Sequence, residues 1–341
     1  MKKKLLFGLL VVAGLVSFII YTFVSTGFFR EIKNTDGYEV VAQIPLYGAE
    51  DLTISYEDNF MVISQDDRGA GYEGRKRKGG LYLVRLDQPD FEPIRLRAGI
   101  PMLPHGINLY KMDSSRYLLF VVNHLKEHTI EKFELIGDSL THLETYRDPA
   151  IVSPNDVVAL DEDRFYFTND HGYTSKFGLL LENYLGLAVS NVVFFDGSNF
   201  NEAADGIGYA NGINISKDRS QLLVASPRKF KLKYYDILAD CKLAFDHNLD
   251  VGSGIDNIEV DLEGNLWMGS HPNLLGFTAY SGGKKTTAPS EIIKVSDQDK
   301  VESLYENDGT LISASSVVAP YKDLLIVGTV MDKYVTVLRK R

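Results

Sequence analysis

Six polar residues, placed about fifty positions apart, each precede a short apolar segment and offer mostly oxygen atoms for chemistry. They are Glu50, His105, Asn155, Asn211, Asp256 and Ser315, with successive separations of 55, 50, 56, 45 and 59 residues. Calcium prefers carboxylate and amide oxygens, whereas zinc or copper is expected to recruit histidine or cysteine. If the fold brings these positions together, the set, joined by Asn257 beside Asp256, predicts a calcium site.

Two of the same segments carry a second acidic residue one position later. Asp51 follows Glu50, and Asp156 follows Asn155. Consecutive side chains of a strand point to opposite sides, so each doublet could serve two ions stacked along one axis. A single asparagine before a strand is more often a turn or cap residue. The interpretation therefore depends on the coincidence of several such positions.

Two histidines bracket a predicted strand pair in one of these segments. His105 begins the inner strand and His124 ends the returning strand, so both should lie at the same face. Beside a metal, such a pair could hold a water molecule and take its proton. In the alternative, His105 only hydrogen-bonds a neighbouring backbone group in a crowded channel. His171 and His271 each close a second strand elsewhere and are candidates for the same pocket.

Repeated strand pairs with a period near fifty residues are typical of the blades of a β-propeller. In a propeller the first strand of every blade lines the central channel, so the six polar positions would converge. The terminal segments Tyr38–Ile44 and Tyr334–Leu338 are predicted to complete one blade together. The expected fold is all-β, a single six-bladed propeller over residues 38–341, with Ser175–Leu187 covering one mouth of the channel.

The first 27 residues form a segment that is separate from the predicted propeller. Three lysines precede Leu5–Val24, which is apolar, uncharged and long enough to cross ~30 Å of hydrocarbon as a helix. We expect a transmembrane helix over 1–27 and a juxtamembrane linker over 28–37, with the propeller on the extracytoplasmic side. The alternative is a cleaved signal peptide and a secreted protein, although the apolar run exceeds the usual core and no clear cleavage motif follows it.

Composition narrows the classes of function. A net charge of −10 argues against a nucleic-acid partner, and the single cysteine, Cys241, allows no intrachain disulfide. The sequence contains no G-x-S-x-G nucleophile motif and no glycine-rich phosphate loop that leads into a helix.

In several motifs the chain resembles the paraoxonase/arylesterase family of six-bladed calcium propellers, within the gluconolactonase-like superfamily. The motifs are GAEDL (Gly48–Leu52), PHGIN (Pro104–Asn108), NHLKEHTIEKF (Asn123–Phe133), SPNDVVAL with FYFTNDH (Ser153–His171), YLGLAVSNVVFF (Tyr184–Phe195), ANGINIS (Ala210–Ser216), DNIEVD (Asp256–Asp261) and LWMGSHPN (Leu266–Asn273). They run in the order of the family and cover nearly the whole region after the apolar helix.

The resemblance implies two calcium ions. The catalytic ion would be held by Glu50, Asn155, Asn211, Asp256 and Asn257, and the structural ion by Asp51, Asp156 and the backbone carbonyl of Ile107. It further implies that His105 and His124 activate water, that Asn155 assists the oxyanion, and that His271 lies near the site. The implied reaction is hydrolysis of a small lactone or aryl ester.

The chain also departs from the family. Animal members join their N-terminal strand to the C-terminus by a disulfide, which Cys241 alone cannot form. A function of another class also fits a calcium-bound propeller, namely a membrane-tethered scaffold without catalysis. Such a scaffold would keep the Asp51 and Asp156 pair for stability but would have no need of His105 and His124.

Overall fold

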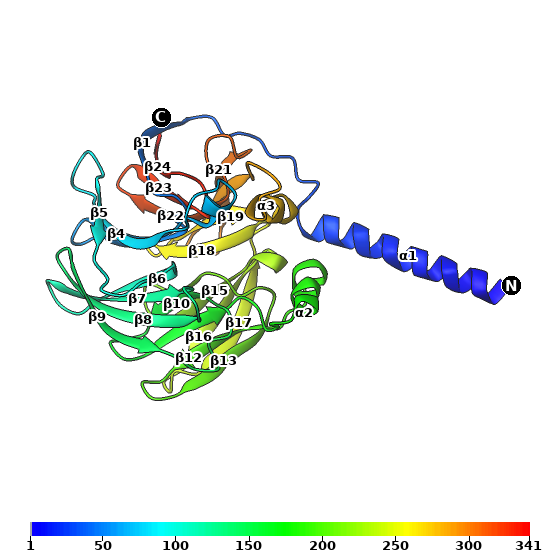
Figure 1. The fold of residues 1–341 in the computed structure, drawn as a ribbon, viewed down its shortest axis with the longest axis horizontal. Helices are drawn as coiled ribbons and strands as arrows, with labels where there is room; N and C mark the ends of the chain where they lie inside the picture. The colour runs from blue at the N-terminus through cyan, green and yellow to red at the C-terminus, as the bar shows by residue number, and fades with distance from the viewer. Residues whose placement is uncertain (1) are drawn as a thin grey trace.

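The computed structural model describes residues 2–341, and in this part of the chain six four-stranded antiparallel sheets form a propeller (Figure 1). The expected all-β, six-bladed fold is confirmed. From the channel outwards, the first blade consists of β2 (Asp51–Ser55), β3 (Phe60–Asp66), β4 (Gly79–Arg85) and β5 (Pro93–Leu96), and the second of β6 (Pro104–Lys111), β7 (Arg116–Asn123), β8 (Thr129–Ile136) and β9 (Ser139–Tyr146). The third blade consists of β10 (Pro154–Ala159), β11 (Phe165–Asn169), β12 (Ser190–Phe195) and β13 (Phe200–Ile207), and the fourth of β14 (Ile213–Ile215), β15 (Gln221–Ser226), β16 (Lys231–Ile237) and β17 (Leu243–Asp250). The fifth blade consists of β18 (Gly254–Val260), β19 (Leu266–His271), β20 (Ser290–Val295) and β21 (Val301–Asn307), and the sixth of β22 (Ser315–Tyr321), β23 (Leu324–Thr329), β24 (Val335–Lys340) and β1 (Tyr38–Ile44).

The ring closes by strand pairing between the two ends of the chain. Strand β1 runs antiparallel to β24, with Tyr38 opposite Lys340 and Ile44 opposite Val335. The prediction that the terminal segments share one blade is confirmed. Because Cys241 is a free cysteine, this closure depends on backbone hydrogen bonds and on the apolar contacts of the shared blade.

The apolar core lies between neighbouring blades. Phe120 of the second blade packs against Phe165 of the third at a ring-centroid distance of 5.3 Å, and both rings are fully buried. Burying a phenylalanine side chain stabilises a fold by about 1.5–3 kcal/mol. Contacts of this kind fix the angle between blades, and so they set which residues meet at the channel.

Four of the innermost strands contain a β-bulge at the predicted polar positions. The register shifts fall between Pro104 and Ile107, Pro154 and Val157, Ile255 and Ile258, and Ser315 and Val317. At a bulge two residues of one strand oppose a single residue of its partner. Simple alternation therefore fails there, and two consecutive side chains can face the same neighbour.

Asp256 and Asn257, although consecutive, both contact Ser316 Oγ, at 2.6 and 3.3 Å. One sequence-based expectation changes because of these bulges. In the sixth blade Ser316, and not Ser315, reaches the channel site. The hydroxyl of Ser315 instead donates to the carbonyl oxygens of Ser270 and Glu291.

Few helical elements interrupt the strands. They are α1 (Lys2–Ser25), α2 (Lys176–Leu180), η2 (Leu181–Leu185), α3 (Leu274–Ser281) and the short turns η1 (Arg68–Gly71) and η3 (Pro227–Lys229). Helix α1 projects from the propeller, and its C-terminal end lies beside α3 (Figure 1). Over Lys3–Ser25 it is long and apolar enough to cross a membrane, a property that signal sequences share.

Candidate active site

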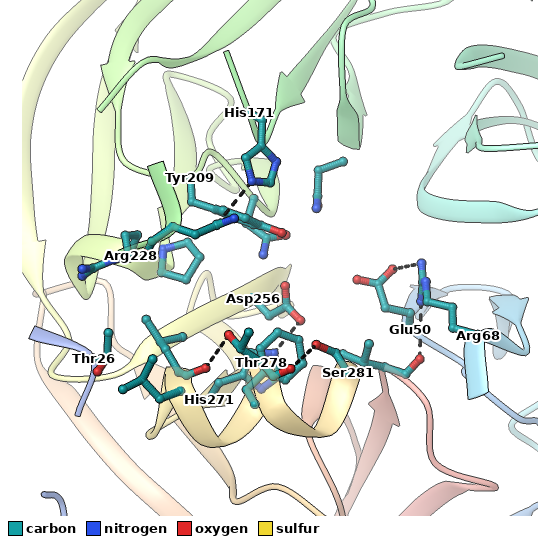
Figure 2. A pocket seen from close by; sticks show the side chains of 18 of the residues that line it. Thr26, Glu50, Arg68, His171, Tyr209, Arg228, Asp256, His271, Thr278 and Ser281 are labelled. Carbon is teal, nitrogen blue, oxygen red and sulfur yellow. Dashed lines mark hydrogen bonds and ion pairs between the residues drawn. The ribbon is translucent and has the colours of Figure 1, made fainter. Parts of the chain in front are cut away.

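A cavity of about 330 Å³ opens at one mouth of the channel, on the side of α3 and η2. Its inner end is polar and is lined by Glu50, Asn155, Asn211 and Asp256, which come from four different blades. In Figure 2 the side chains of Glu50 and Asp256 point toward the same space in the middle of the pocket. The fold therefore brings together residues that are separated by more than two hundred positions in the sequence.

Several buried oxygens at this inner end lack a hydrogen-bond partner. They are Asn155 Oδ1, Asn211 Oδ1, Asn257 Oδ1 and Glu50 Oε2, the last of which makes ion-pair contacts with His105 Nε2 at 3.0 Å and with Arg68 Nη2 at 3.7 Å. Leaving a buried acceptor unpaired costs about 1–3 kcal/mol, so such groups cluster where a ligand or ion completes them. Amide and carboxylate oxygens in this number fit calcium.

The composition of the donor set matters for the choice of metal. Within residues 2–341, no group of three or more His, Cys, Asp or Glu side chains is arranged to hold a metal ion by itself. The site relies on amide oxygens as well as carboxylates, which is the chemistry of a hard cation and differs from that of a zinc centre.

The carboxylate of Glu50 is held in its ionised form. Burial alone would raise the pKa of Glu50, but the positive charges of His105 and Arg68 and a hydrogen bond from Ser316 outweigh burial and lower the pKa to about 2. Arg68 Nη2 lies 3.7 Å from Glu50 Oε2. A negative charge is thus available at the inner end of the cavity at any physiological pH.

A second layer of acidic residues lies away from the cavity, deeper in the channel. Asp51 Oδ2 accepts a hydrogen bond from the backbone amide of Ile107 at 2.7 Å, and Asp156 Oδ2 accepts one from Ile213 at 2.8 Å. Each carboxylate therefore links its own blade to the next. Burial and nearby carboxylates raise the pKa of both aspartates well above the usual range. A positive charge bound in this layer would therefore stabilise the ionised carboxylates.

A third buried carboxylate, that of Glu259, belongs to this layer, and the spacing of the polar positions did not predict it. Glu259 follows Asn257 by two residues on β18 and is 8% exposed. Burial, together with the charge of Asp156, raises the pKa of Glu259 well above its ordinary value. The signal was present in the DNIEVD motif, because a residue two positions after Asn257 returns to the same side of a strand.

The two histidines of the second blade form a hydrogen-bonded pair. His105 Nδ1 lies 3.0 Å from His124 Nε2, while the other nitrogen of His105 faces Glu50. Burial, followed by the charges of His105 and His128, lowers the pKa of His124 to about 2. His124 is therefore neutral and can accept a hydrogen bond from a protonated His105.

The other two predicted histidines also line the cavity. His271 Nε2 lies 3.1 Å from Asp256 Oδ2, and its ring stacks on Phe277 at a centroid distance of 3.9 Å. His171 pairs with Asp170 at 2.7 Å and reaches Asn183 of η2 at 3.3 Å. Both thus connect the polar end of the cavity to its outer wall.

Other residues of the cavity wall could not be placed from the sequence. They are Thr26 at the end of α1, Arg68, Tyr209, Arg228 and the apolar residues of α3. Arg68 lies just before a glycine-rich basic loop, a context typical of solvent-exposed chain. Helix α3 follows the HPN motif, and its first turn is capped by the side chain of Asn273, which accepts from Gly276 at 2.8 Å.

A six-bladed propeller with oxygen donors and a histidine pair at one mouth of its channel defines a class of propeller enzymes. The family model for arylesterases matches residues 62–337. Human serum paraoxonase/arylesterase 1 is 34% identical over 307 residues, which is 84% of each chain, and chicken serum paraoxonase/arylesterase 2 is 33% identical over 304 residues, again 84% of each. The chain belongs to the arylesterase family and is an ester hydrolase.

Solved structures share the fold at much lower identity. A luciferin-regenerating enzyme aligns with a TM-score of 0.57 at 16% identity, covering 89% of this chain and 94% of the other. A putative gluconolactonase gives 0.58 at 12%, covering 92% and 95%. A calcium-binding regucalcin of Agrobacterium tumefaciens gives 0.50 at 12%, covering 90% and 93%. These likenesses concern the propeller architecture alone.

Proposed function

We propose that the protein hydrolyses lactones or aryl esters with the help of calcium held at the inner end of the cavity. The observation that carries this proposal is the convergence of unpaired oxygens from Glu50, Asn155, Asn211 and Asn257, with Asp256 beside them. The family supports it, because relatives one third identical over most of both chains are named paraoxonase/arylesterase.

Calcium bound there would polarise the ester carbonyl and offset the negative charge that develops on its oxygen. The side-chain amide of Asn155 lies at the same end of the cavity and can donate a further hydrogen bond to that oxygen. A deeper ion, held by Asp51, Asp156 and the Ile107 carbonyl, would serve stability.

The histidine pair handles the proton. His105 lines the cavity, and when its ring is neutral with the proton on Nδ1 and Glu50 is turned to the metal instead of to Nε2, that Nε2 can accept a proton from a water molecule that attacks the carbonyl. Nδ1–H of the resulting imidazolium then donates to His124 Nε2, across the observed separation of 3.0 Å. Because burial keeps His124 neutral, it stabilises the charged ring without competing for the proton. His105 then returns the proton to the alkoxide or phenoxide oxygen that leaves when the C–O bond of the tetrahedral intermediate breaks, which gives the carboxylic acid and the alcohol or phenol.

We further propose that α1 anchors the enzyme in a membrane, with the propeller on the extracytoplasmic side. Lysines precede the apolar span, and large apolar side chains are exposed near its C-terminal end, including Phe29, Phe177 and Leu180. A protease added to intact cells should remove the propeller and leave the N-terminus protected. Release of the propeller into the medium would instead indicate a cleaved signal.

The test of catalysis is hydrolysis by the full chain in detergent. Lactones and phenyl esters are assayed with calcium, after chelation, and after calcium is returned. Turnover that disappears on chelation and recovers on calcium addition supports the proposal, and the ratio of the two rates names the preferred class. If neither class of substrate is hydrolysed while calcium still raises the melting temperature, the alternative function, a calcium-stabilised scaffold without catalysis, is favoured.

A further inference from the structure

The C-terminal end of α1 is built into the wall of the cavity. Thr22 and Thr26 are 6% and 2% exposed, and Thr26 lines the cavity directly. The backbone amide of Leu274, at the start of α3, donates to Thr26 O at 2.9 Å. Gly27 turns the chain there with φ +69°, and a Cβ atom at this position would lie 2.2 Å from Pro272 O. The end of the apolar helix is therefore a fitted part of the enzyme.

One arginine joins this helix end to the segment that covers the mouth. Arg228 donates from Nε to Asn183 O at 2.8 Å and from Nη2 to Tyr184 O at 2.9 Å, both in η2. From Nη1 it donates to Ser25 O at 3.2 Å, at the last residue of α1. Figure 2 shows Arg228 beside Thr26 on this side of the pocket.

The charge of Arg228 is balanced in an unusual way. The side chain is buried at 6% exposure, and among the described residues no carboxylate lies within ion-pair distance of it. Its partners are instead carbonyl groups at the ends of α1 and η2, where the helix dipole favours a positive charge. A buried arginine whose planar guanidinium group donates to several carbonyl groups at once fixes the relative position of those groups.

The wall that these contacts complete is apolar. Tyr184, Pro227, Leu274 and Phe277 line the same cavity as Arg228. A substrate whose ester group lies at the inner end would place its alkyl or aryl substituent against this wall. Each methylene group buried there contributes about fourfold to binding.

We propose that Arg228 is a positioning residue for substrate specificity: by holding the end of α1 against η2, it completes the apolar wall that binds the non-reacting part of the substrate. This inference rests on the proposed ester hydrolysis. It also makes the apolar helix a working part of the enzyme, since a chain cleaved near residue 27 would lose Thr22, Ser25 and Thr26 from this wall.

The test measures kcat/KM for a series of lactones of one ring size with alkyl substituents of increasing length, using the full chain in lipid nanodiscs. In the wild type kcat/KM should rise about two- to fourfold per methylene until the wall is covered. Arg228→Ala should flatten this rise, mainly through KM, so that the loss grows from a few-fold for the shortest substituent to tenfold or more for the longest. Arg228→Lys keeps the charge but cannot span three carbonyl groups, and should recover only part of the rise.

Arg30→Ala is the matched control. Arg30 also ties the N-terminal segment to the propeller, through Glu291, Glu306 and Gly252 O, but it does not line the cavity. It should keep the wild-type dependence on chain length. Equal losses for all substituents in Arg228→Ala would mean a structural role only and would overturn the inference, as would an unchanged profile. A wild type that hydrolyses the shortest lactone without any dependence on length would overturn it while leaving the proposed function intact.

Discussion

The two layers of the channel use similar residues in different ways. In the layer at the cavity, Asn155, Asn211 and Asn257 each leave a buried side-chain oxygen without a partner. In the deeper layer, Asp51 and Asp156 turn their carboxylates to backbone amides of the neighbouring blade. The amide oxygens of the layer at the cavity remain free to bind a ligand, whereas the carboxylates of the deeper layer hold neighbouring blades together.

On the proposed function, this contrast places chemistry and stability at different depths of one channel. An unpaired oxygen beside a cavity can exchange between water, metal and substrate, whereas a carboxylate whose two oxygens each accept an amide hydrogen bond is fixed in place. Substitutions in the outer layer should therefore affect turnover first, and substitutions in the deeper layer should affect folding first. The following variants are chosen to break or sharpen this division.

Asp256→Ala should have the largest effect on turnover. It removes a carboxylate from the outer layer, and loss of the metal's polarising effect should lower kcat/KM by at least ~10³-fold. The melting temperature of the chelated protein should change little. Asp240→Ala, at an exposed position outside the channel, is the control and should retain full activity. A similar loss in both variants would show that the outer layer has no special role.

His105→Gln should reduce kcat/KM by about 10²-fold, since general-base assistance is lost while the carbonyl remains polarised. The remaining activity should respond to added imidazole, which can enter the cavity and replace the missing base. Stopped-flow or steady-state assays across a range of imidazole concentrations measure this recovery. The division of roles fails if His105→Gln abolishes turnover as completely as Asp256→Ala does.

Asp51→Asn should mainly lower stability. The substitution weakens the hydrogen bond that the Ile107 amide donates to Asp51 and puts a neutral amide where the proposed deeper ion would bind, with an expected cost of about 1–3 kcal/mol. Urea unfolding with and without calcium measures this change. The stabilisation by calcium should shrink in Asp51→Asn, and turnover of the folded fraction should fall less than in Asp256→Ala. The reverse order would assign catalysis to the deeper layer.

Two adjacent serines provide a finer comparison. Ser316 Oγ donates to Asp256 Oδ2 at 2.6 Å and to Glu50 Oε1 at 3.2 Å, whereas Ser315 Oγ donates to backbone carbonyls. Ser316→Ala should weaken the affinity of the outer layer for calcium several-fold, by calorimetric titration. Ser315→Ala should leave that affinity unchanged. Equal effects of the two substitutions would contradict the bulged geometry of β22.

The smallest effect is expected outside the channel, at Asp261. Burial would raise the pKa of Asp261, but the indole of Trp267, at 2.8 Å, and the contacts with Asn265 lower it. A carboxylate with a lowered folded-state pKa adds stability above its unfolded value of about 3.9 and loses it as the pH falls through the folded value. Fluorescence of the single tryptophan reports unfolding. Between pH 6 and 3 the wild type should lose more stability than Asp261→Asn, and equal losses would contradict the shift.

The period of the polar positions predicted the blades and, except in the sixth blade, the residues that meet at the channel, while the strand-like terminal segments predicted the ring closure. It could not predict the outermost strands, such as β17, because they face solvent and carry no continuous apolar run. Nor could it place Ser316, since a bulge changes which of two adjacent residues faces inwards. The wall residues Arg68 and Arg228 come from short turns between strands. The path of these turns depends on tertiary contacts, so the spacing of residues in the sequence cannot predict that the two arginines line the cavity.

The most direct test of the account is a calcium titration of the chelated full-length protein that records binding heat and lactone turnover in parallel. The account predicts two binding events, of which one restores turnover and is lost in Asp256→Ala, while the other raises the melting temperature and is lost in Asp51→Asn. Turnover that persists without calcium, or calcium binding that both substitutions leave unchanged, would contradict the assignment of the two layers.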